Sequence, residues 1–167
     1  EHYEASKEYK KRIGFTDKDL TEEPYLLKPK FPSGKKPEYD FWMYGIMDRI
    51  VMTDPIKCID FKTTATPIGQ SVLDSSKQFT YYLWALWCMT GKLHDLLILN
   101  FVKGSIKRNI PAKVYLKRTT RSLDDFESLM NEAQDLYKQC RIDRIMDKTE
   151  GNNCWRCPYK NICNNFN

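Results

Sequence analysis

Runs of aromatic and branched side chains, broken by turn residues, predict the central strands of this chain. Residues 39–52 and 56–63 have this composition, and Thr53-Asp54-Pro55 between them is a turn signal. If the two runs form a hairpin around this turn, Asp48 lies directly opposite Asp60, with Cβ atoms roughly 5 Å apart. A slip of one residue would point Asp48 to the other face, so this prediction depends on the register.

Helical periodicity marks the segments around this hairpin. Residues 76–90 carry an apolar stripe of Phe79, Leu83, Leu86 and Trp87 and end at Gly91. The remaining expected elements are a helix over 1–13, a strand-like or irregular connection over 22–31, a strand over 94–103, an edge strand over 106–118 interrupted by Pro111, and a long amphipathic helix over 122–147 opened by Ser122. A hairpin turn is expected at Lys103-Gly104-Ser105. An α–β–β–α–β order predicts an α/β fold, in which helices flank a mixed β-sheet.

The predicted hairpin gathers charged side chains at one point of the sheet. Asp60 and Lys62 are two residues apart on a strand, so they project from the same face. Two carboxylates facing each other repel, which makes the pair costly unless a cation lies between them. Gly45 precedes Asp48 by three residues and would allow another group to approach the backbone closely. The alternative interpretation is a surface hairpin with ordinary solvated charges.

The helix over 76–90 adds two polar side chains. Gln78 and Tyr82 are four residues apart, so they share one helical face. Viewed alone, Gln78 is typical of a solvated helix position and Tyr82 of a core aromatic. Because they follow the strand that carries Asp60 and Lys62, they could instead belong to the same functional site.

Three segments occur in an order that is typical of one nuclease family. They read GIMD (45–48), IDFKTT (59–64) and QFTYY (78–82). Together they resemble the RecB-like branch of the PD-(D/E)XK nuclease superfamily, which implies a restriction-endonuclease-like mixed sheet and a metal-dependent DNA nuclease.

The resemblance assigns a role to each matching residue. Asp48, Asp60 and the backbone carbonyl of Phe61 would hold Mg²⁺ or Mn²⁺, with His2 as a further candidate ligand. Lys62, with Gln78 and Tyr82, would complete the catalytic site.

Three cysteines near the C-terminus, Cys154, Cys157 and Cys163, have the spacing of a metal or cluster site. The resemblance extends to them, because AddB-type and CRISPR-associated RecB-like nucleases carry such a triple as part of a [4Fe–4S] site. Four thiolates are usual for such clusters, and here the fourth ligand is missing or unknown, so Zn²⁺ is the alternative. Cys140, which shares a stripe with Phe126, Ala133 and Tyr137, is interpreted as a core residue, as are Cys58 and Cys88.

Bulk properties agree with an intracellular, single-domain protein. The 167 residues would divide into a nuclease core over 1–148 and a cysteine-rich tail over 149–167. The chain begins in mid-helix without a capping residue, which predicts a truncated N-terminus. The longest apolar run is too short to span a membrane. The formal charge of +5 is compatible with a polyanionic partner but is not specific for one.

Basic side chains form two groups that could contact phosphates. The first is Lys28, Lys30, Lys35 and Lys36, and the second is Lys103, Lys107, Arg108, Lys113, Lys117, Arg118 and Arg121. Alternatively, the second group protects the edge of a sheet from aggregation. Near the first group, Tyr25, Phe31, Tyr39 and Trp42 could stack on the bases of a single strand.

The resemblance favours an exonuclease that acts on single-stranded DNA or DNA ends in recombination, repair or replication. The alternative is an inactive or accessory nucleic-acid-binding domain within a larger helicase–nuclease or CRISPR adaptation complex. In either case DNA is the expected partner, and a helicase or another protein subunit is a further one.

Overall fold

The computed structural model describes residues 20–52, 56–105, 108–143, 154 and 157–158. The expected first helix, His2 and Cys163 lie outside these residues. The elements in chain order are β1 (Leu20–Leu27), β2 (Met43–Val51), β3 (Lys57–Thr64), α2 (Gln70–Asp74), α3 (Lys77–Thr90), β4 (Leu96–Val102), β5 (Lys113–Thr119), α4 (Leu123–Tyr137) and the π-helical turn η2 (Lys138–Ile142). No helix of the described part is long and apolar enough to cross a membrane.

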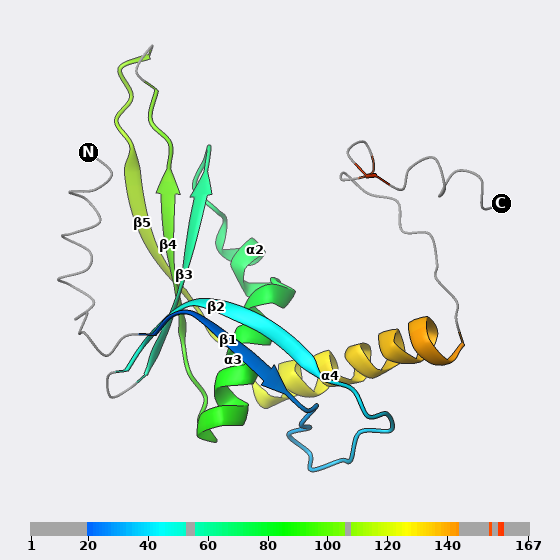
Figure 1. The fold of residues 1–167 in the computed structure, drawn as a ribbon. Helices are drawn as coiled ribbons and strands as arrows, with labels where there is room; N and C mark the ends of the chain where they lie inside the picture. The colour runs from blue at the N-terminus through cyan, green and yellow to red at the C-terminus, as the bar shows by residue number, and fades with distance from the viewer. Residues whose placement is uncertain (1–19, 53–55, 106–107, 144–153, 155–156, 159–167) are drawn as a thin grey trace.

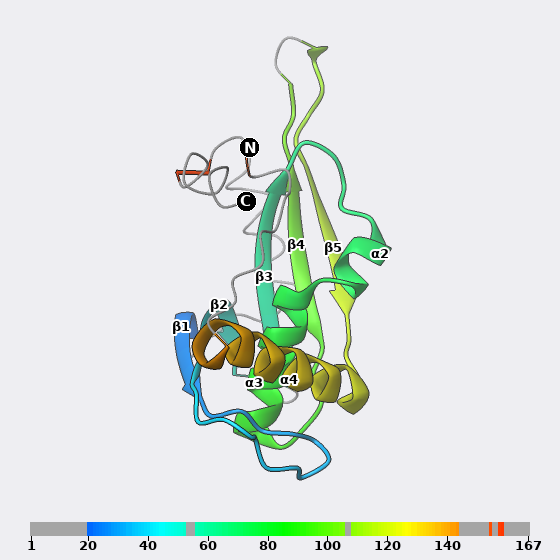
Figure 2. The same ribbon diagram turned by 90° about the vertical axis from the view of Figure 1, so that its right-hand side faces the viewer.

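The five strands form one mixed sheet in the order β1-β2-β3-β4-β5. Strands β3 and β4 are parallel, and the other neighbours are antiparallel. The parallel pair needs a crossover, which α2 and α3 supply. Figures 1 and 2 show that α3 and α4 lie on the same side of the sheet. The expected α/β fold, a mixed sheet flanked by helices, is therefore confirmed.

Helix α3 forms the centre of the hydrophobic core. Of its expected stripe, Phe79, Leu83 and Leu86 are buried, and Trp87 is half-buried against the same cluster. Trp84 is fully buried as well, and its indole N–H donates to the carbonyl oxygen of Lys30 at 3.0 Å. Gly91 ends the helix with φ +71°, a left-handed conformation that glycine adopts without steric cost.

The predicted register of the central hairpin is correct. Arg49 pairs with Ile59, and the pairing continues to Val51 and Lys57. Followed away from the turn, the ladder nevertheless ends at Arg49, so the next residue, Asp48, has no partner in it. Strands β1 and β2 then diverge from the other strands toward α4 (Figure 1). The predicted strand pair of Asp48 and Asp60 is therefore not part of the ladder.

The side chains of β2 change the face of the sheet to which they point where this ladder ends. Met47 and Ile50 contact the same core cluster, although residues three apart on a regular strand point to opposite faces. On the neighbouring strand, Glu22 has φ +50°, and the β1–β2 pairing passes over it from Thr21↔Arg49 to Glu23↔Met47. The irregularity of both strands is thus located beside Asp48.

The expected turn at Lys103-Gly104-Ser105 is wrong. Ser105 and Ile110 exchange two backbone hydrogen bonds of 2.8 and 3.0 Å, so Lys103, Gly104 and Ser105 lie before the turn rather than in it. Gly104 has another role, because a Cβ atom there would lie 2.5 Å from the carbonyl oxygen of Ile110. Strand β5 begins only at Lys113, after Pro111, and the hairpin extends past the rest of the sheet (Figure 1).

The last helix begins as expected and ends earlier. Ser122 and Asp125 form a capping box, in which the Ser122 hydroxyl accepts from the Asp125 N–H at 3.2 Å. Regular α-helix continues to Tyr137 and passes into η2, whereas the sequence pattern predicted one helix to residue 147. Residues beyond Asp143 in that expected helix lie outside the described part.

Arg121 is buried, so its assignment to the basic surface group is wrong. Its guanidinium donates to the carbonyl oxygens of Leu73 at 2.9 Å and Ser76 at 3.0 Å, and to the Thr80 hydroxyl at 2.7 Å. These acceptors belong to the end of α2 and the start of α3. Arg121 therefore fixes the corner from which α3 projects Gln78 and Tyr82.

Candidate active site

Asp60 lies in the middle of β3 and has no exposed surface. Its Oδ1 accepts from the Lys62 ammonium group at 3.1 Å. Its Oδ2 is buried and has no hydrogen-bond partner among the described residues. Burial raises the pKa of Asp60 to about 6; Lys62 partly offsets this effect, and the charge of Asp48 adds to it. The site therefore holds a carboxylate whose negative charge is poorly compensated.

Asp48 reaches this point by a different route from the one the sequence predicts. Instead of facing Asp60 across the ladder, its Oδ2 accepts a hydrogen bond from the backbone N–H of Phe61 at 2.9 Å. The Asp48 carboxylate thus accepts the hydrogen bond that a backbone carbonyl of a paired strand would accept, at the point where β2 leaves β3. The two acids still converge, since the charge of Asp48 acts on Asp60.

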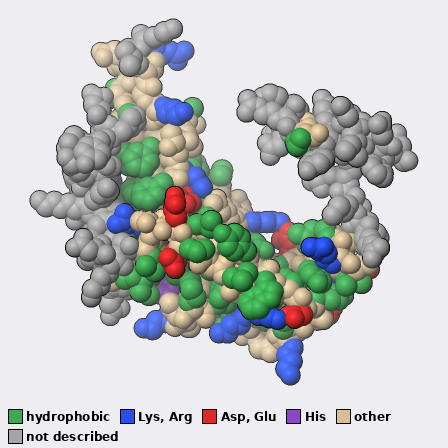
Figure 3. Space-filling view, viewed as in Figure 1, with side chains coloured by type: hydrophobic (Ala, Val, Ile, Leu, Met, Phe, Trp, Pro, Cys, Tyr) green, Lys and Arg blue, Asp and Glu red, His purple; other side chains and the backbone are tan. Residues whose placement is uncertain are grey.

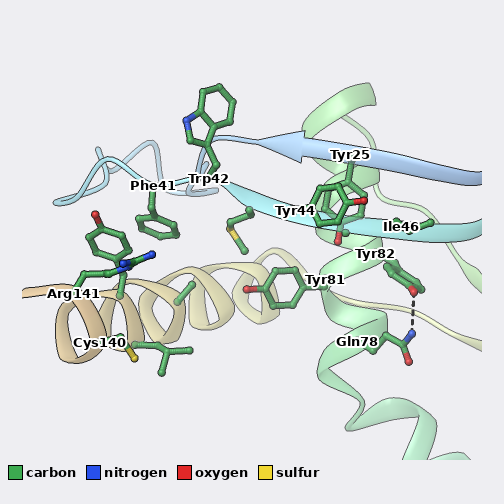
Figure 4. Close-up of a pocket in the computed structure, with 15 residues that line it drawn as sticks. Tyr25, Phe41, Trp42, Tyr44, Ile46, Gln78, Tyr81, Tyr82, Cys140 and Arg141 are labelled. Atoms are coloured by element: carbon green, nitrogen blue, oxygen red, sulfur yellow. Dashed lines mark hydrogen bonds between the residues drawn. The ribbon is translucent and has the colours of Figure 1, made fainter. Parts of the chain in front are cut away.

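Lys62, Gln78 and Tyr82 continue from Asp60 as one line of hydrogen bonds. The Lys62 ammonium group donates to Gln78 Oε1 at 3.0 Å. Gln78 Nε2 donates to the Tyr82 hydroxyl at 2.8 Å (Figure 4). Because an ammonium group only donates, Lys62 fixes which end of the Gln78 amide faces it. The structure therefore brings the three segments of the sequence motif into direct contact.

Tyr82 is a neutral hydroxyl at ordinary pH. Burial raises its pKa, the hydrogen bond from Gln78 partly offsets this, and the nearby charges of Asp48 and Asp60 raise it further. Because its oxygen already accepts from Gln78, its own proton is available for an acceptor in the site.

Asn100 is a site residue that sequence reasoning missed. It is fully buried on β4 and pairs with Lys62 in the parallel ladder. Its amide accepts from the Ile68 N–H at 2.9 Å and donates to the Thr64 hydroxyl at 2.7 Å and, more weakly, to the Lys62 carbonyl at 3.4 Å. The signal was one amide within the apolar run LLILNFV. Asn100 holds the end of β3 in place directly after Lys62.

Gly45 does permit a close approach, but the approaching group is Tyr25. A Cβ atom on Gly45 would lie 2.2 Å from the Tyr25 hydroxyl oxygen, and the two residues face each other across β1 and β2. Tyr25 and Phe31 are both buried, so the expectation that these two stack on bases is wrong. Burial raises the pKa of Tyr25, and Tyr82 adds to the effect.

The donor set fits a hard divalent cation. Mg²⁺ and Mn²⁺ prefer oxygen ligands, and the carboxylates of Asp48 and Asp60 supply such oxygens at this point. The unpartnered Oδ2 of Asp60 is the observation that supports the fit. Across the described residues, no three His, Cys, Asp or Glu side chains gather closely enough to bind a metal by themselves. A cation here would thus need a backbone carbonyl or further groups, including water.

The cysteine site predicted from the sequence is not assembled among the described residues. Cys154 and Cys157 are linked by a hydrogen bond from the Cys157 N–H to the Cys154 carbonyl at 3.3 Å, and Cys163 lies outside the description. Cys58 is buried, and Cys88 packs against the core, as expected. Cys140 is half-buried in η2 and lines a groove rather than the core.

Several basic residues of the first group lie over aromatic rings. The ammonium group of Lys28 is 4.8 Å from the centre of the Trp42 ring, and it also pairs with Asp40. The ammonium group of Lys30 is 4.7 Å from the Trp87 ring. In the second group, Arg118 pairs with Asp95 at 3.1 Å. These contacts leave the cations at the surface, where phosphates could reach them.

Comparisons with known proteins place this chain in a family. The model of the PD-(D/E)XK nuclease superfamily matches residues 6–164. A solved structure titled "Crystal structure of SSO0001" is 16% identical, with a TM-score of 0.49, over 97% of this chain and 66% of that chain, slightly less than two thirds of its length. No curated protein matches the sequence. The sheet is of the restriction-endonuclease-like type, and nucleases of this superfamily typically use Mg²⁺ or Mn²⁺. Because the family match covers nearly the whole chain, this protein belongs to the PD-(D/E)XK nuclease superfamily.

Proposed function

We propose that the protein is a metal-dependent DNA nuclease that hydrolyses phosphodiester bonds in single strands or at DNA ends. The observation that carries this proposal is the continuous contact from Asp60 through Lys62 and Gln78 to Tyr82, with Asp48 beside it. A structural salt bridge would not need a buried acid with one oxygen left without a donor in the described residues. Family membership supports the same reaction class.

The acids are the proposed cation ligands. Asp48, Asp60 and the carbonyl oxygen of Phe61 would hold Mg²⁺ or Mn²⁺, and His2 remains a candidate ligand outside the described residues. When bound, such an ion lowers the pKa of a water molecule and neutralises charge on the scissile phosphate. The protein's part is to keep two carboxylates side by side, which the end of the β2–β3 ladder at Arg49 makes possible.

Lys62 is the proposed catalytic cation. Its ammonium group is held between Asp60 and Gln78, and its side chain is 32% exposed, so a phosphate can reach it. In this position its positive charge would orient the attacking water, favour loss of that water's proton to another base, and stabilise the charge that develops on the pentacovalent phosphorus.

Gln78 and Tyr82 are proposed to position the other partners. Gln78 holds the Lys62 ammonium group through its oxygen and the Tyr82 hydroxyl through its nitrogen. The neutral hydroxyl of Tyr82 can donate a hydrogen bond to a non-bridging phosphate oxygen. Both residues come from one face of α3, so the helix sets their distance from β3.

Cleavage assays on substituted proteins test this assignment. We expect Asp60→Ala and Lys62→Ala each to lower the rate of Mn²⁺-dependent cleavage of a labelled DNA strand by about 100-fold or more. Lys77→Ala is the matched control, because Lys77 neighbours Gln78 on α3 but pairs with Glu132 at the surface. Turnover retained in Asp60→Ala or Lys62→Ala would refute the site.

The same assay separates the main alternative. A wild-type protein that binds DNA but does not cleave it with Mg²⁺ or Mn²⁺ would be an accessory nucleic-acid-binding domain. That outcome would favour a role inside a larger helicase–nuclease or CRISPR adaptation complex.

A second metal centre is proposed at Cys154, Cys157 and Cys163 from their spacing alone. The centre would be an iron–sulfur cluster or Zn²⁺, with a fourth ligand still to be found. Metal analysis together with the visible absorption spectrum of anaerobically purified protein distinguishes the two. Protein that contains neither iron nor zinc would exclude both.

A further inference from the structure

A groove of about 570 Å³ opens beside the active site and shares two of its residues. It runs from Gln78 and Tyr82 on α3, along β2 and the loop before it, to the end of α4 (Figure 4). Its volume is within the range of sites that bind small molecules or single nucleotides. The groove therefore continues the surface on which a substrate at Lys62 would lie.

Aromatic side chains from separate elements line this groove. They are Tyr25, Phe41, Trp42, Tyr44, Tyr81 and Tyr137. Arg141 is the one charged side chain in the described lining, which contains no carboxylate. A groove of this composition suits flat, uncharged rings much better than it suits a row of phosphates.

Two of these aromatic residues are unusually accessible. Trp42 is 56% exposed and Tyr44 is 64% exposed. Large aromatic side chains are normally buried, and a patch of exposed ones is typical of a surface that binds a partner. Figure 3 shows hydrophobic side chains gathered over β2 and toward α4 on this face. In Figure 4, Trp42 comes from the loop before β2 and Tyr44 from β2, and the Trp42 ring points away from α4, at the outer edge of the groove.

The walls of the groove are held in place without a ligand. Phe41 stacks on Tyr137 with ring centres 5.0 Å apart, which ties the loop to α4. The side chain of Gln134 on α4 accepts from the backbone N–H of Glu38 at 2.6 Å, and Lys28 lies over Trp42. Because these contacts already order the aromatic rings, binding would cost little conformational entropy.

We propose that this groove binds the unpaired bases of a nucleic-acid strand whose adjoining phosphodiester lies at Asp60 and Lys62. The proposal rests on the nuclease function proposed above and names the form of substrate that the site accepts. Base faces are available for stacking only in an unpaired strand, because a duplex stacks them internally. Positive charge for the backbone of such a strand comes from two residues. Lys28 lies over Trp42, and Arg141 lies at the far end of the groove.

Continuity with the catalytic residues favours a nucleic acid over a peptide as the occupant. Gln78 and Tyr82 belong to both the groove and the hydrogen-bonded line that ends at Asp60, so a ligand in the groove extends toward the reacting bond. The sequence predicted Tyr25, Phe31, Tyr39 and Trp42 as stacking residues. The groove retains Trp42 among them and adds Tyr44, Tyr81 and Tyr137.

Equilibrium binding by metal-free protein in a chelator tests the proposal without cleavage. The probes are a fluorescent oligothymidine of about 12 nucleotides, a blunt duplex of equal length, and a strand in which abasic residues replace the thymidines. We expect the wild type to prefer the oligothymidine. The double variant Trp42→Ala, Tyr44→Ala should bind it at least about 10-fold more weakly and should bind the abasic strand as the wild type does.

Controls address folding and specificity. Both residues are more than half exposed, so the double variant should keep the thermal midpoint of the wild type. Trp42→Phe retains a ring and should retain most of the affinity. Leu116→Ala removes a comparably exposed apolar side chain from β5, outside the groove, and should leave binding unchanged.

Each result decides one proposal. Equal affinity of the wild type for the thymidine and abasic strands, wild-type affinity in the double variant, or no binding to any probe would overturn the role of the groove. A peptide or another protein segment as the natural occupant would produce one of these results. Stacking-dependent binding without Mn²⁺-dependent cleavage would sink the nuclease function and leave the groove standing. Cleavage by the wild type with unchanged binding in the double variant would overturn the role of the groove and leave the nuclease function standing.

Discussion

At the scale of single residues, the site depends on one carboxyl group placed where its charge is costly. Asp60 is fully buried, and only its Oδ1 has a partner, the Lys62 ammonium group, within the described part of the chain. The Asp48 charge opposes ionisation of Asp60 as well. Such a group destabilises the metal-free protein in its charged form and becomes favourable when a cation shares the charge.

The pH dependence of stability tests this statement. Because folding raises the pKa of Asp60 from 3.8 to about 6, the folded state keeps a proton that the unfolded state has lost between these values, so stability falls as pH rises through this range. We expect the difference in unfolding free energy, wild type minus Asp60→Asn, to fall by about 2 kcal/mol between pH 4 and pH 7 in a chelator. Urea unfolding at each pH measures it.

Asp74 supplies a control of opposite sign. Its hydrogen bonds with Thr119 and Gln70 lower its pKa, so its contribution to stability is present above the unfolded-state pKa and is lost as pH falls through the folded-state pKa. The difference between wild type and Asp74→Asn should therefore rise with pH in the acid range. A flat or rising curve for Asp60→Asn would contradict the assignment of Asp60 as the strained carboxyl group.

At the scale of secondary-structure elements, the site forms where two regular patterns stop. The β2–β3 ladder ends at Arg49, which frees the Phe61 N–H to bind the Asp48 carboxylate. Helix α3 then has to begin at a fixed angle for Gln78 to meet Lys62. Arg121, just after β5, sets that angle through the backbone of α2 and α3.

Loss of the Arg121 guanidinium should therefore destabilise the whole domain. Arg121→Met leaves the carbonyl oxygens of Leu73 and Ser76 buried without their donor, and we expect it to cost about 3 kcal/mol or more in urea unfolding. Arg118→Met is the control: its pair with Asp95 is exposed, so its loss should cost less than about 1 kcal/mol. Equal effects of the two substitutions would show that the corner at Arg121 is not structural.

At the scale of the whole molecule, folding and cation binding should be linked. The two acids converge only when β2 and β3 are assembled, so the proposed cation would bind the folded chain and not the unfolded one. The groove along β2 and α4 extends the same surface, and Lys28 lies over Trp42 at its edge. The proposed cleavage, base stacking and backbone binding would thus share one continuous surface.

Thermal unfolding with and without Mn²⁺ tests this linkage independently of cleavage. At a Mn²⁺ concentration about 100 times the dissociation constant, the wild-type melting temperature should rise by about 5 °C or more. Asp48→Asn and Asp60→Asn should lose most of this rise, and Asp74→Asn should keep it. A rise of the same size in Asp60→Asn would exclude Asp60 as a ligand.

Much of the fold could be predicted because it follows from local patterns. The apolar runs around Asp60 and the apolar stripe of α3 each reflect which side chains must leave water, and the structure confirms the strand and the helix that they predicted. The register of the hairpin was predictable too, since the turn signal Thr53-Asp54-Pro55 centres the pairing of the two runs. Turn chemistry was less informative elsewhere: Gly104 indicated a turn but is needed for a close backbone contact.

By itself, the sequence determined which chemical groups meet, because motif spacing on a strand and a helix fixes which face each side chain occupies. Only the tertiary structure decided how they meet. The Asp48 carboxylate binds the Phe61 N–H because β2 diverges from the sheet, and Asn100 and Arg121 fix the ends of β3 and α3 from distant parts of the chain. The aromatic groove likewise joins β2 to α4, whose residues are about ninety positions apart. Such contacts depend on how elements pack, and no local periodicity records them.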